Sequence, residues 1–208
     1  VESLSELMSH IPGFYSSYNS VEGNDSYMVS RGHAQKYANT ILFLLNGQRI
    51  NEDYTGGINY LLRSLKLTQI ERVEIIRGPG SALYGTNAFN GVINLITKIQ
   101  PKLSVSLGNL GTKRASLAWQ QSVYDWQLGF SYDKEQQDGE RYTQIFDRFA
   151  LEHGTADPHT SSQAMFSANY HNFSWLTSYS NYQFEQYYLF RRVSNQFNQL
   201  QLNNLIHQ

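Results

Sequence analysis

Two glycines in the middle of the sequence have the spacing of a phosphate-binding loop. Gly80 and Gly85 match the glycines of the pattern G-x-x-x-x-G-K-[ST], in which backbone amides cradle phosphates and a lysine contacts them. The residues after Gly85 are Thr86 and Asn87, so the lysine is missing. No glycine triplet opens a long helix here, which also argues against a dinucleotide site.

Paired carboxylates occur at Glu71 with Glu74 and at Glu52 with Asp53. Such pairs can serve as general acid and general base. No nucleophile, second base or oxyanion donor accompanies them in the sequence. We therefore expect no hydrolytic site, and we expect that the protein is not an enzyme.

A third group consists of His153, Asp157 and His159, which lie in one expected loop. Imidazole and carboxylate groups bind metal ions, but this spacing matches no common ligand pattern. The sequence contains no cysteine, which excludes thiolate sites and disulfides. We therefore expect neither a metal site nor a cofactor.

The composition narrows the class of protein. The 208 residues have a formal net charge of −1, so no basic surface favours nucleic acid, and 14% of them are aromatic. No apolar run of about 18 residues indicates a membrane-spanning helix, although a spanning β-strand escapes such a search because only alternate residues face lipid. The sequence starts at Val1 without the basic and apolar segments of a signal peptide, so we expect none in this chain.

The first 100 residues mix helical and strand patterns and predict a compact α/β unit. The expected elements are a helix over residues 4–11, strands over residues 27–30, 41–45 and 48–50, and a second helix over residues 58–65. Between two of these strands, Asn46 and Gly47 predict a two-residue hairpin turn.

Residues 70–98 indicate two strands joined by a glycine-rich bend. The first strand carries Glu71, Arg72 and Glu74, and strand alternation would place charges on both of its faces. Such a strand needs polar partners on both sides. The second strand, residues 91–97, is apolar enough to be a buried central strand.

After Pro101 the helical period ends and alternation of apolar with polar residues takes over. The expected strands cover residues 103–108, 113–123, 126–134, 161–170, 173–184 and about 197–206. Two-residue turns are expected at Tyr124 with Asp125 and at His171 with Asn172, and longer polar loops over residues 135–160 and 186–196. Tight turns at one end and long loops at the other are typical of an outer-membrane barrel.

Six strands are too few to close a transmembrane barrel, since single-chain examples start at about eight. An open edge in lipid would leave backbone groups without hydrogen bonds. We therefore expect an incomplete barrel. A soluble antiparallel sandwich also alternates and remains an alternative for this half of the chain.

The segment from residue 70 to residue 98 resembles the plug segment of TonB-dependent outer-membrane receptors, in which an (I/V)ERIEV-like strand leads into R-G-P-x-S-x-x-Y-G and A-x-x-G-V-I-N-I-I-T-K. The residues that carry this resemblance are Glu71, Arg72, Glu74, Arg77, Gly78, Pro79, Ser81, Tyr84, Gly85, Ala88, Gly91, Val92, Ile93, Asn94, Thr97 and Lys98. Further upstream, Ile11-Pro12-Gly13, Ser30-Arg31-Gly32 and residues 41–49 are similar to the family's I-P-G-V, I-R-G and V-L-V-L-x-D-G-V-R. Asn46 departs from this pattern, because the family usually has Asp there.

The resemblance implies a plug domain over residues 1–100, a small mixed sheet with short helices, and the first six or so antiparallel strands of a barrel over residues 101–208. The family's barrel has about 22 strands. The implied protein is an active-transport receptor in the outer membrane of a Gram-negative bacterium. It would be surrounded by outer-membrane lipid and driven by the TonB complex, whose binding segment is not expected in this chain. The ligand expected first is a ferric siderophore, with cobalamin, haem or an oligosaccharide as alternatives.

The resemblance also implies roles for individual residues. Ligand contacts would come from two apical plug loops, through Tyr18, Asn19, Asn24, Asp25, Asn51, Asp53 and Tyr54. Contacts between plug and barrel would come from Arg31, Gly32, Glu71, Arg72, Glu74, Arg77, Gly78, Pro79, Tyr84, Gly85, Gly91 and Asn94.

Two interpretations from other classes stay open at this point. A soluble α/β enzyme could use residues 80–85 to bind the phosphates of a nucleotide. Alternatively, a secreted β-rich module could fold from residues 101–208 alone.

Overall fold

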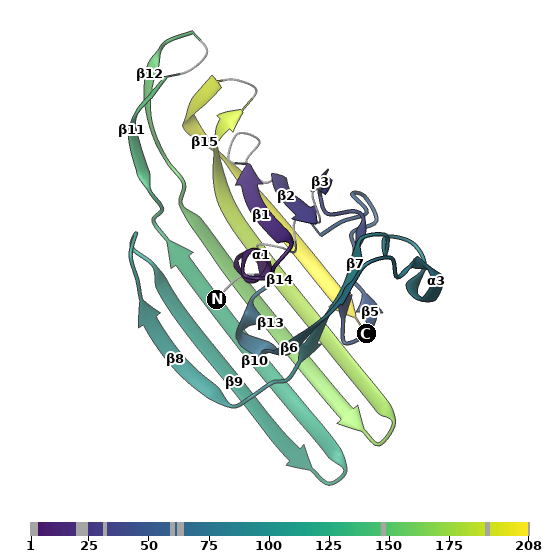
Figure 1. Ribbon diagram of the computed structural model, residues 1–208. Coiled ribbons are helices and arrows are strands. Elements are labelled where there is room, and N and C mark those ends of the chain that lie inside the picture. The colour runs from purple at the N-terminus through teal and green to yellow at the C-terminus, as the bar shows by residue number, and fades with distance from the viewer. Residues whose placement is uncertain are drawn as a thin grey trace. The chain divides into compact units, whose positions relative to one another are not determined.

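The computed structural model describes residues 4–19, 25–30, 33–58, 61, 65–146, 149–189 and 192–207. Contacts between residues separate the chain into two compact units, with the main division between Gln100 and Pro101 and with Asn19 grouped in the second unit (Figure 1). Each unit has its own sheets.

The elements of the first unit alternate between strands and short helices. They are α1 (Leu4–Ser9), β1 (Phe14–Asn19), β2 (Asp25–Ser30), β3 (His33–Lys36), β4 (Ile41–Leu45), β5 (Gln48–Arg49), the 3-10 helix η2 (Leu67–Gln69), β6 (Ile70–Arg77), α3 (Ser81–Tyr84) and β7 (Gly91–Thr97). Strands β1, β2 and β3 form one sheet, and a second, mixed sheet has the order β5-β4-β7-β6.

The mixed sheet holds the core of the first unit. Its central strands β4 and β7 are parallel, whereas β5 and β6 run antiparallel to their neighbours. Every residue of β4 is buried, which explains its continuous apolar sequence. Phe43 and Ile93 are fully buried, as are Leu4 and Met8 of α1, which lie four residues apart on one side of that helix. Each such side chain contributes about 1.5–3 kcal/mol of hydrophobic stabilisation.

The expected hairpin turn joins β4 to β5. Asn46 and Gly47 have φ angles of 49° and 84°. A turn with two positive φ angles matches the twist of the strands, and Asn-Gly is the dipeptide that adopts it most readily. The turn prediction is therefore confirmed.

Other predictions for the first unit were incomplete. Strands β1 and β3 were not predicted, although the aromatic residues of β1 favour a strand. Of the helix expected over residues 58–65, only Leu61 has a helical assignment among the described residues, and residues 59–60 and 62–64 lie outside them.

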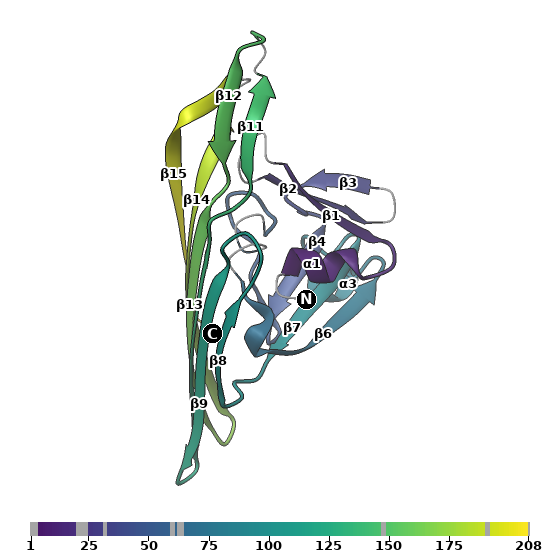
Figure 2. The same cartoon turned by 90° about the vertical axis from the view of Figure 1, so that its left-hand side faces the viewer.

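The second unit is built from antiparallel strands. They are β8 (Lys102–Leu107), β9 (Lys113–Val123), β10 (Trp126–Gln137), β11 (Arg141–Phe146), β12 (Glu152–Ala156), β13 (His159–Tyr170), β14 (Phe173–Leu189) and β15 (Arg192–His207). Six of them form one open sheet in the order β15-β14-β13-β10-β9-β8, and β11 pairs with β12 (Figure 2).

All six predicted strands are present in this sheet, and the two-residue turns at Tyr124 with Asp125 and at His171 with Asn172 are confirmed. The loop predicted over residues 135–160 is wrong in part, because it contains the hairpin of β11 and β12. The long loop over residues 186–196 is also wrong, because β14 continues to Leu189 and β15 begins at Arg192. Both errors have the same cause: polar residues in these segments indicated a loop, but the residues lie on paired strands.

The two faces of the six-stranded sheet have opposite composition. We call one the aromatic face; its exposed members include Leu117, Trp119, Phe130, Tyr132, Phe166, Trp175 and Tyr179. Strand register places these residues on one side, as in the pairs Phe130 with Trp119 and Phe130 with Phe166. The opposite side, the polar face, carries Ser116, Ser131, Asp133, Glu135, Ser161, Gln163, Ser178 and Ser180, together with the buried Met165, Tyr182 and Phe184. A soluble protein exposes the polar side of such a sheet. Here the large apolar side chains of the aromatic face are exposed instead, so the pattern is inverted.

Candidate functional site

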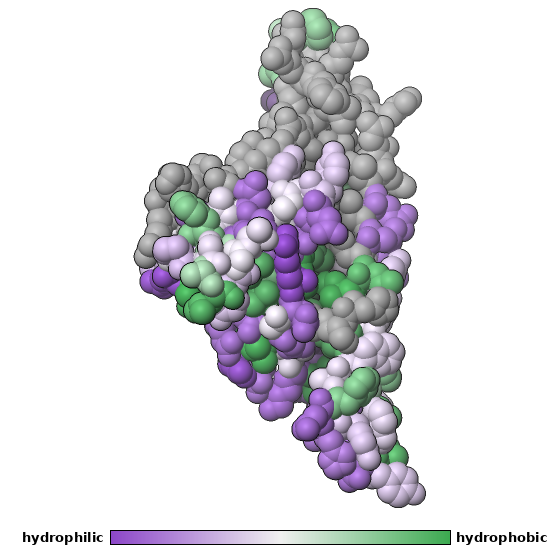
Figure 3. Space-filling model, turned by 90° about the vertical axis from the view of Figure 1, so that its right-hand side faces the viewer, coloured by the Kyte–Doolittle hydropathy of each residue, from purple (hydrophilic) through white to green (hydrophobic). Residues whose placement is uncertain are grey.

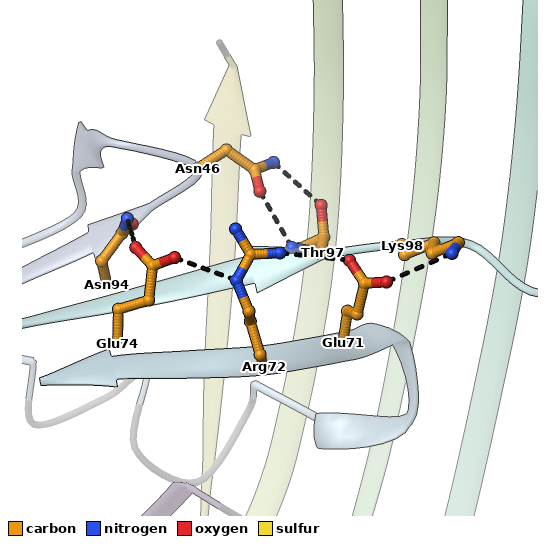
Figure 4. A network of polar contacts seen from close by, with 7 residues as sticks. All are labelled: Asn46, Glu71, Arg72, Glu74, Asn94, Thr97 and Lys98. Atoms are coloured by element: carbon orange, nitrogen blue, oxygen red, sulfur yellow. Dashed lines mark hydrogen bonds and ion pairs between the residues drawn. The ribbon is translucent and has the colours of Figure 1, made fainter.

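A β-bulge gathers the charged residues of β6 on one side. Ile70 pairs with Thr97 and Arg72 pairs with the adjacent Ile96, so Glu71 is an extra residue without an opposite partner. A bulge of this kind turns two consecutive side chains to the same side of a strand. Glu71 and Arg72 therefore lie on the side of Glu74 (Figure 4). The prediction that these three charges point from both faces is wrong for this reason.

These side chains form a continuous polar network (Figure 4). Arg72 Nε lies 2.9 Å from Glu74 Oε1, and Arg72 Nη1 lies 3.4 Å from Glu71 Oε2. Lys98 Nζ contacts the other oxygen of Glu71 at 3.1 Å. Asn94 Nδ2 extends the network by donating to Glu74 Oε2 at 3.0 Å. The hydrogen bonds from Arg72 and then Asn94 lower the pKa of Glu74, because both stabilise its ionised form.

The β4–β5 turn is fastened to β7 by two asparagines. Asn46 Nδ2 donates to Thr97 Oγ1 at 2.8 Å, and Asn46 Oδ1 accepts from the backbone amide of Thr97 at 2.9 Å. Asn94 Oδ1 accepts from the amide of Gly47 at 2.9 Å. An amide side chain at position 46 both donates and accepts, whereas the family's usual carboxylate would only accept.

The glycine-rich bend between β6 and β7 is shaped by close backbone contacts. Gly78 has a φ of 110°, and a Cβ atom on Gly91 would lie 2.7 Å from the carbonyl oxygen of Ile76. Gly85, with a φ of 77°, ends α3. Gly80 occupies the N-cap of α3, and no side chain bonds there. Gly78, Gly85 and Gly91 thus each meet a requirement of the backbone.

The surface around this bend is exposed. Arg72 and Glu74 keep side-chain exposures of 57% and 47%, and Arg77, Pro79 and Tyr84 are also exposed. Leu83 is 89% exposed. On the face shown in Figure 3, small groups of apolar side chains lie among hydrophilic ones.

The second predicted site, the loop of residues 51–55, contains both buried and exposed side chains. Asn51 is 7% exposed, and its Oδ1 accepts from the amide of Phe43 at 2.8 Å. Its Nδ2 donates to the carbonyl oxygens of Ile41 and Gly56 at 3.0 and 2.9 Å. Asp53 is exposed and Tyr54 is 93% exposed. The side chain of Asn51 therefore holds the loop, and the other two face outward.

The remaining predicted residues are located by backbone alone or lie outside the described residues. Tyr18 and Asn19 end β1, and Asp25 begins β2. Asn24, Arg31 and Gly32 lie outside the described residues.

Asn87 was not predicted as a site residue. Its Oδ1 accepts from Arg49 Nη2 at 2.9 Å, and its Nδ2 donates to the carbonyl oxygens of Asn39 and Gly56 at 2.7 and 2.8 Å. Its φ is 70°, a conformation that Asn tolerates better than most residues. An asparagine shortly after a glycine was the available sequence signal, but such residues usually mark turns.

The second unit has its own charged cluster on the polar face. Arg114 Nε donates to Glu135 Oε2 at 2.8 Å, and His159 Nε2 lies 3.4 Å from Glu135 Oε1. A pocket of about 130 Å³ lies beside it, lined by Gln136, Gln137, Asp138, Pro158, His159, Thr160, Gln183 and Phe184.

No three metal-ligating side chains come together among the residues that the structure describes. Within the same residues, no helix has both the length and the apolar character needed to cross a membrane.

Comparison with known proteins gives relatives for both units. The family profile "TonB-dependent Receptor Plug Domain" matches residues 1–92. The vitamin B12 transporter BtuB of Vibrio vulnificus strain CMCP6 is 38% identical over 110 residues, which are 53% of this chain and 17% of that protein. BtuB of strain YJ016 is 28% identical over 187 residues, which are 86% of this chain and 28% of that protein.

Among solved structures, the pyoverdine outer membrane receptor FpvA of Pseudomonas aeruginosa superposes with a TM-score of 0.63 at 14% identity. The match covers 88% of this chain and 26% of that receptor. At this identity the likeness shows the fold alone. The matched part of the chain thus spans 17 to 28% of the length of these proteins.

The matches and the geometry define a class: a receptor plug with a mixed sheet, followed by antiparallel strands of an open sheet. The plug-domain match over residues 1–92, the BtuB relatives and the shared fold together support a TonB-dependent receptor. The resemblance and the fold class inferred from the sequence are therefore confirmed. The relatives are transporters and receptors, so the expectation that the chain is not an enzyme is confirmed as well.

Proposed function

We propose that the protein captures a scarce nutrient at the cell surface of a Gram-negative bacterium and imports it across the outer membrane with energy from the TonB complex. The observation that carries this proposal is the inverted six-stranded sheet directly after a plug domain. Its aromatic face is exposed and its polar face carries serine, glutamine and charged side chains. An apolar face on the outside and a polar face toward the interior are typical of the strands of a transmembrane barrel.

In this proposal residues 1–100 are the plug and residues 101–208 supply barrel strands. The exposed network of Glu71, Arg72 and Glu74, together with Arg77 and Tyr84, would contact the barrel wall. Exposed ion pairs suit a plug that must be held and later moved, since such pairs stabilise a structure only weakly.

Two ligand classes have support. Ferric siderophores were the first expectation, and receptors for such chelates share the fold. The relatives detected by sequence, at 28 and 38% identity, are vitamin B12 transporters. Relatedness in sequence is stronger support for a shared ligand than likeness of fold. We therefore place cobalamin first and a ferric siderophore second.

The ligand would meet the loops of residues 18–25 and 51–55. Of the described residues in the second loop, Asp53 and Tyr54 point to solvent. An exposed tyrosine offers a flat apolar surface and a hydroxyl, which suits a large polar ligand.

Uptake by living cells tests this function. Gram-negative cells that lack other cobalamin receptors would express the protein and receive radiolabelled cyanocobalamin or a ferric siderophore. We expect cyanocobalamin uptake that stops when the TonB complex is deleted, and lower uptake with Tyr54→Ala. Uptake of the ferric siderophore alone would change the ligand assignment, and uptake of neither compound would contradict the proposal for both.

A further inference from the structure

One carbonyl oxygen joins the proposed ligand loop to the bend after α3. The oxygen of Gly56 accepts from Asn51 Nδ2 at 2.9 Å and from Asn87 Nδ2 at 2.8 Å. Asn51 follows β5, whereas Asn87 comes from the bend that leads into β7. Two segments distant in the sequence thus hold the same atom of the loop.

The loop of residues 52–57 is a braced unit. Glu52 and Gly57 are joined by a backbone hydrogen bond of 2.6 Å, and Thr55 Oγ1 donates to Glu52 Oε2 at 2.7 Å. A Cβ atom on Gly57 would lie 1.5 Å from the carbonyl oxygen of Tyr37, so only glycine fits there. Because these contacts keep the loop from deforming, a displacement of the exposed Tyr54 also displaces Gly56.

Every polar atom of the Asn87 side chain is hydrogen-bonded at this contact with Gly56, which we call the Asn87 junction. Its two hydrogens go to the carbonyl oxygens of Asn39 and Gly56, and its oxygen accepts from Arg49. Arg49 also donates to Thr86 Oγ1 at 3.2 Å. Movement of Gly56 must therefore either break a bond to Asn87 or displace the bend to which α3 is attached.

We propose that Asn87 is a positioning residue that couples occupancy of the loop of residues 52–57 to the bend containing α3. The inference rests on the proposed function, because it takes the ligand to contact Asp53 and Tyr54. Coupling is reciprocal, so loss of the Asn87 junction changes ligand affinity as well as the response of the bend.

A ligand-free experiment tests the junction first. The sequence has no cysteine, so Leu83→Cys accepts a single nitroxide label on α3 in the protein held in outer membranes. Thr55→Val removes a brace of the loop, and we expect it to change the nitroxide spectrum. We expect no such change when Asn87→Asp is also present, since Asp lacks the amide hydrogens bound to Gly56.

Asn90→Asp is the matched control. Asn90 lies in the same bend and donates to Thr40 Oγ1 at 2.9 Å. The effect of Thr55→Val should persist in this background. If Asn87→Asp does not insert, Asn87→Gly replaces it, because glycine adopts the same positive φ without an amide side chain. Equal spectral responses in the Asn87 and Asn90 backgrounds would overturn the coupling.

Addition of cyanocobalamin forms the second arm. We expect it to change the spectrum of the label at position 83 and to bind Asn87→Asp with an affinity altered by about fivefold or more. Binding with the same affinity and the same spectral response in Asn87→Asp would overturn the inference. Absence of binding to every variant would contradict cobalamin as the ligand, while the ligand-free arm still decides the role of Asn87.

Discussion

The two sheets that form the centres of the two units place their apolar side chains in opposite ways. In the mixed sheet of the first unit, every residue of β4 is buried, and the amide of Phe43 donates to the buried Asn51. In the six-stranded sheet, large apolar residues such as Trp119 and Phe130 stay 48% and 38% exposed. In the proposed function this difference corresponds to two solvents, water around the plug and lipid around the strands.

The largest expected effect is on the buried sheet. Phe43→Ala removes a fully buried aromatic side chain from β4, and we expect it to lower the free energy of unfolding by about 3–5 kcal/mol. Denaturant unfolding of the first unit measures this change. Leu83→Ala, at a position 89% exposed, serves as the control and should change stability by less than about 0.5 kcal/mol. Equal losses would contradict the assignment of the core.

The next largest expected effect is a difference between the two faces of the open sheet in their tolerance of a charge. Trp119→Lys puts a charge on the aromatic face, and we expect it to cost about 2–4 kcal/mol in a bilayer and to reduce the protein recovered in outer membranes. Gln120→Lys adds the same charge to the polar face and should be recovered like the parent protein. Similar recovery of both variants would mean that the aromatic face does not contact lipid.

A smaller effect concerns the β4–β5 turn, which Asn46 ties to β7. Asn46→Asp keeps the size of the side chain but loses the hydrogen donated to Thr97 Oγ1. We expect a loss of about 0.5–1.5 kcal/mol in unfolding free energy. Gly47 is unchanged in this variant, so the turn itself remains. A stabilised Asn46→Asp would show that the amide is not the better group at this position.

The smallest effect is a pH dependence from the polar network. The pKa of Glu74 is lowered on folding from its ordinary value of 4.5, chiefly by the hydrogen bond from Arg72. Its stabilising contribution is therefore present above pH 4.5 and is lost as the pH falls through the lower pKa of the folded state. Unfolding midpoints between pH 6 and pH 3 should fall less for Glu74→Gln than for the parent protein. An identical decline would exclude this carboxylate as a cause.

Sequence patterns predicted those features that depend on local residues. Alternation located all six strands of the open sheet, and Asn46 with Gly47 identified the hairpin turn, because both signals lie within a few positions. The bulge at Glu71 depends on the register between β6 and β7, which no local pattern sets.

The candidate site shows the same division. The charged residues of the plug segment were predicted as site residues because the family's motif contains them. The structural use of Asn51 and the junction at Asn87 were missed, since both depend on contacts with Gly56 made only in the folded unit. Asn87 lies 31 positions from Gly56. From the sequence alone, an asparagine that only forms a turn cannot be distinguished from one whose side chain joins distant segments.

The most direct test of the two-solvent account is the accessibility of adjacent residues on β9. Nitroxide labels on Trp119→Cys and Gln120→Cys, in protein reconstituted into bilayers, would be exposed to oxygen, which concentrates in lipid, and to a water-soluble nickel chelate. We predict that oxygen relaxes the label at position 119 more strongly and that the chelate relaxes the label at position 120 more strongly. Equal access of the chelate to both positions would contradict the account.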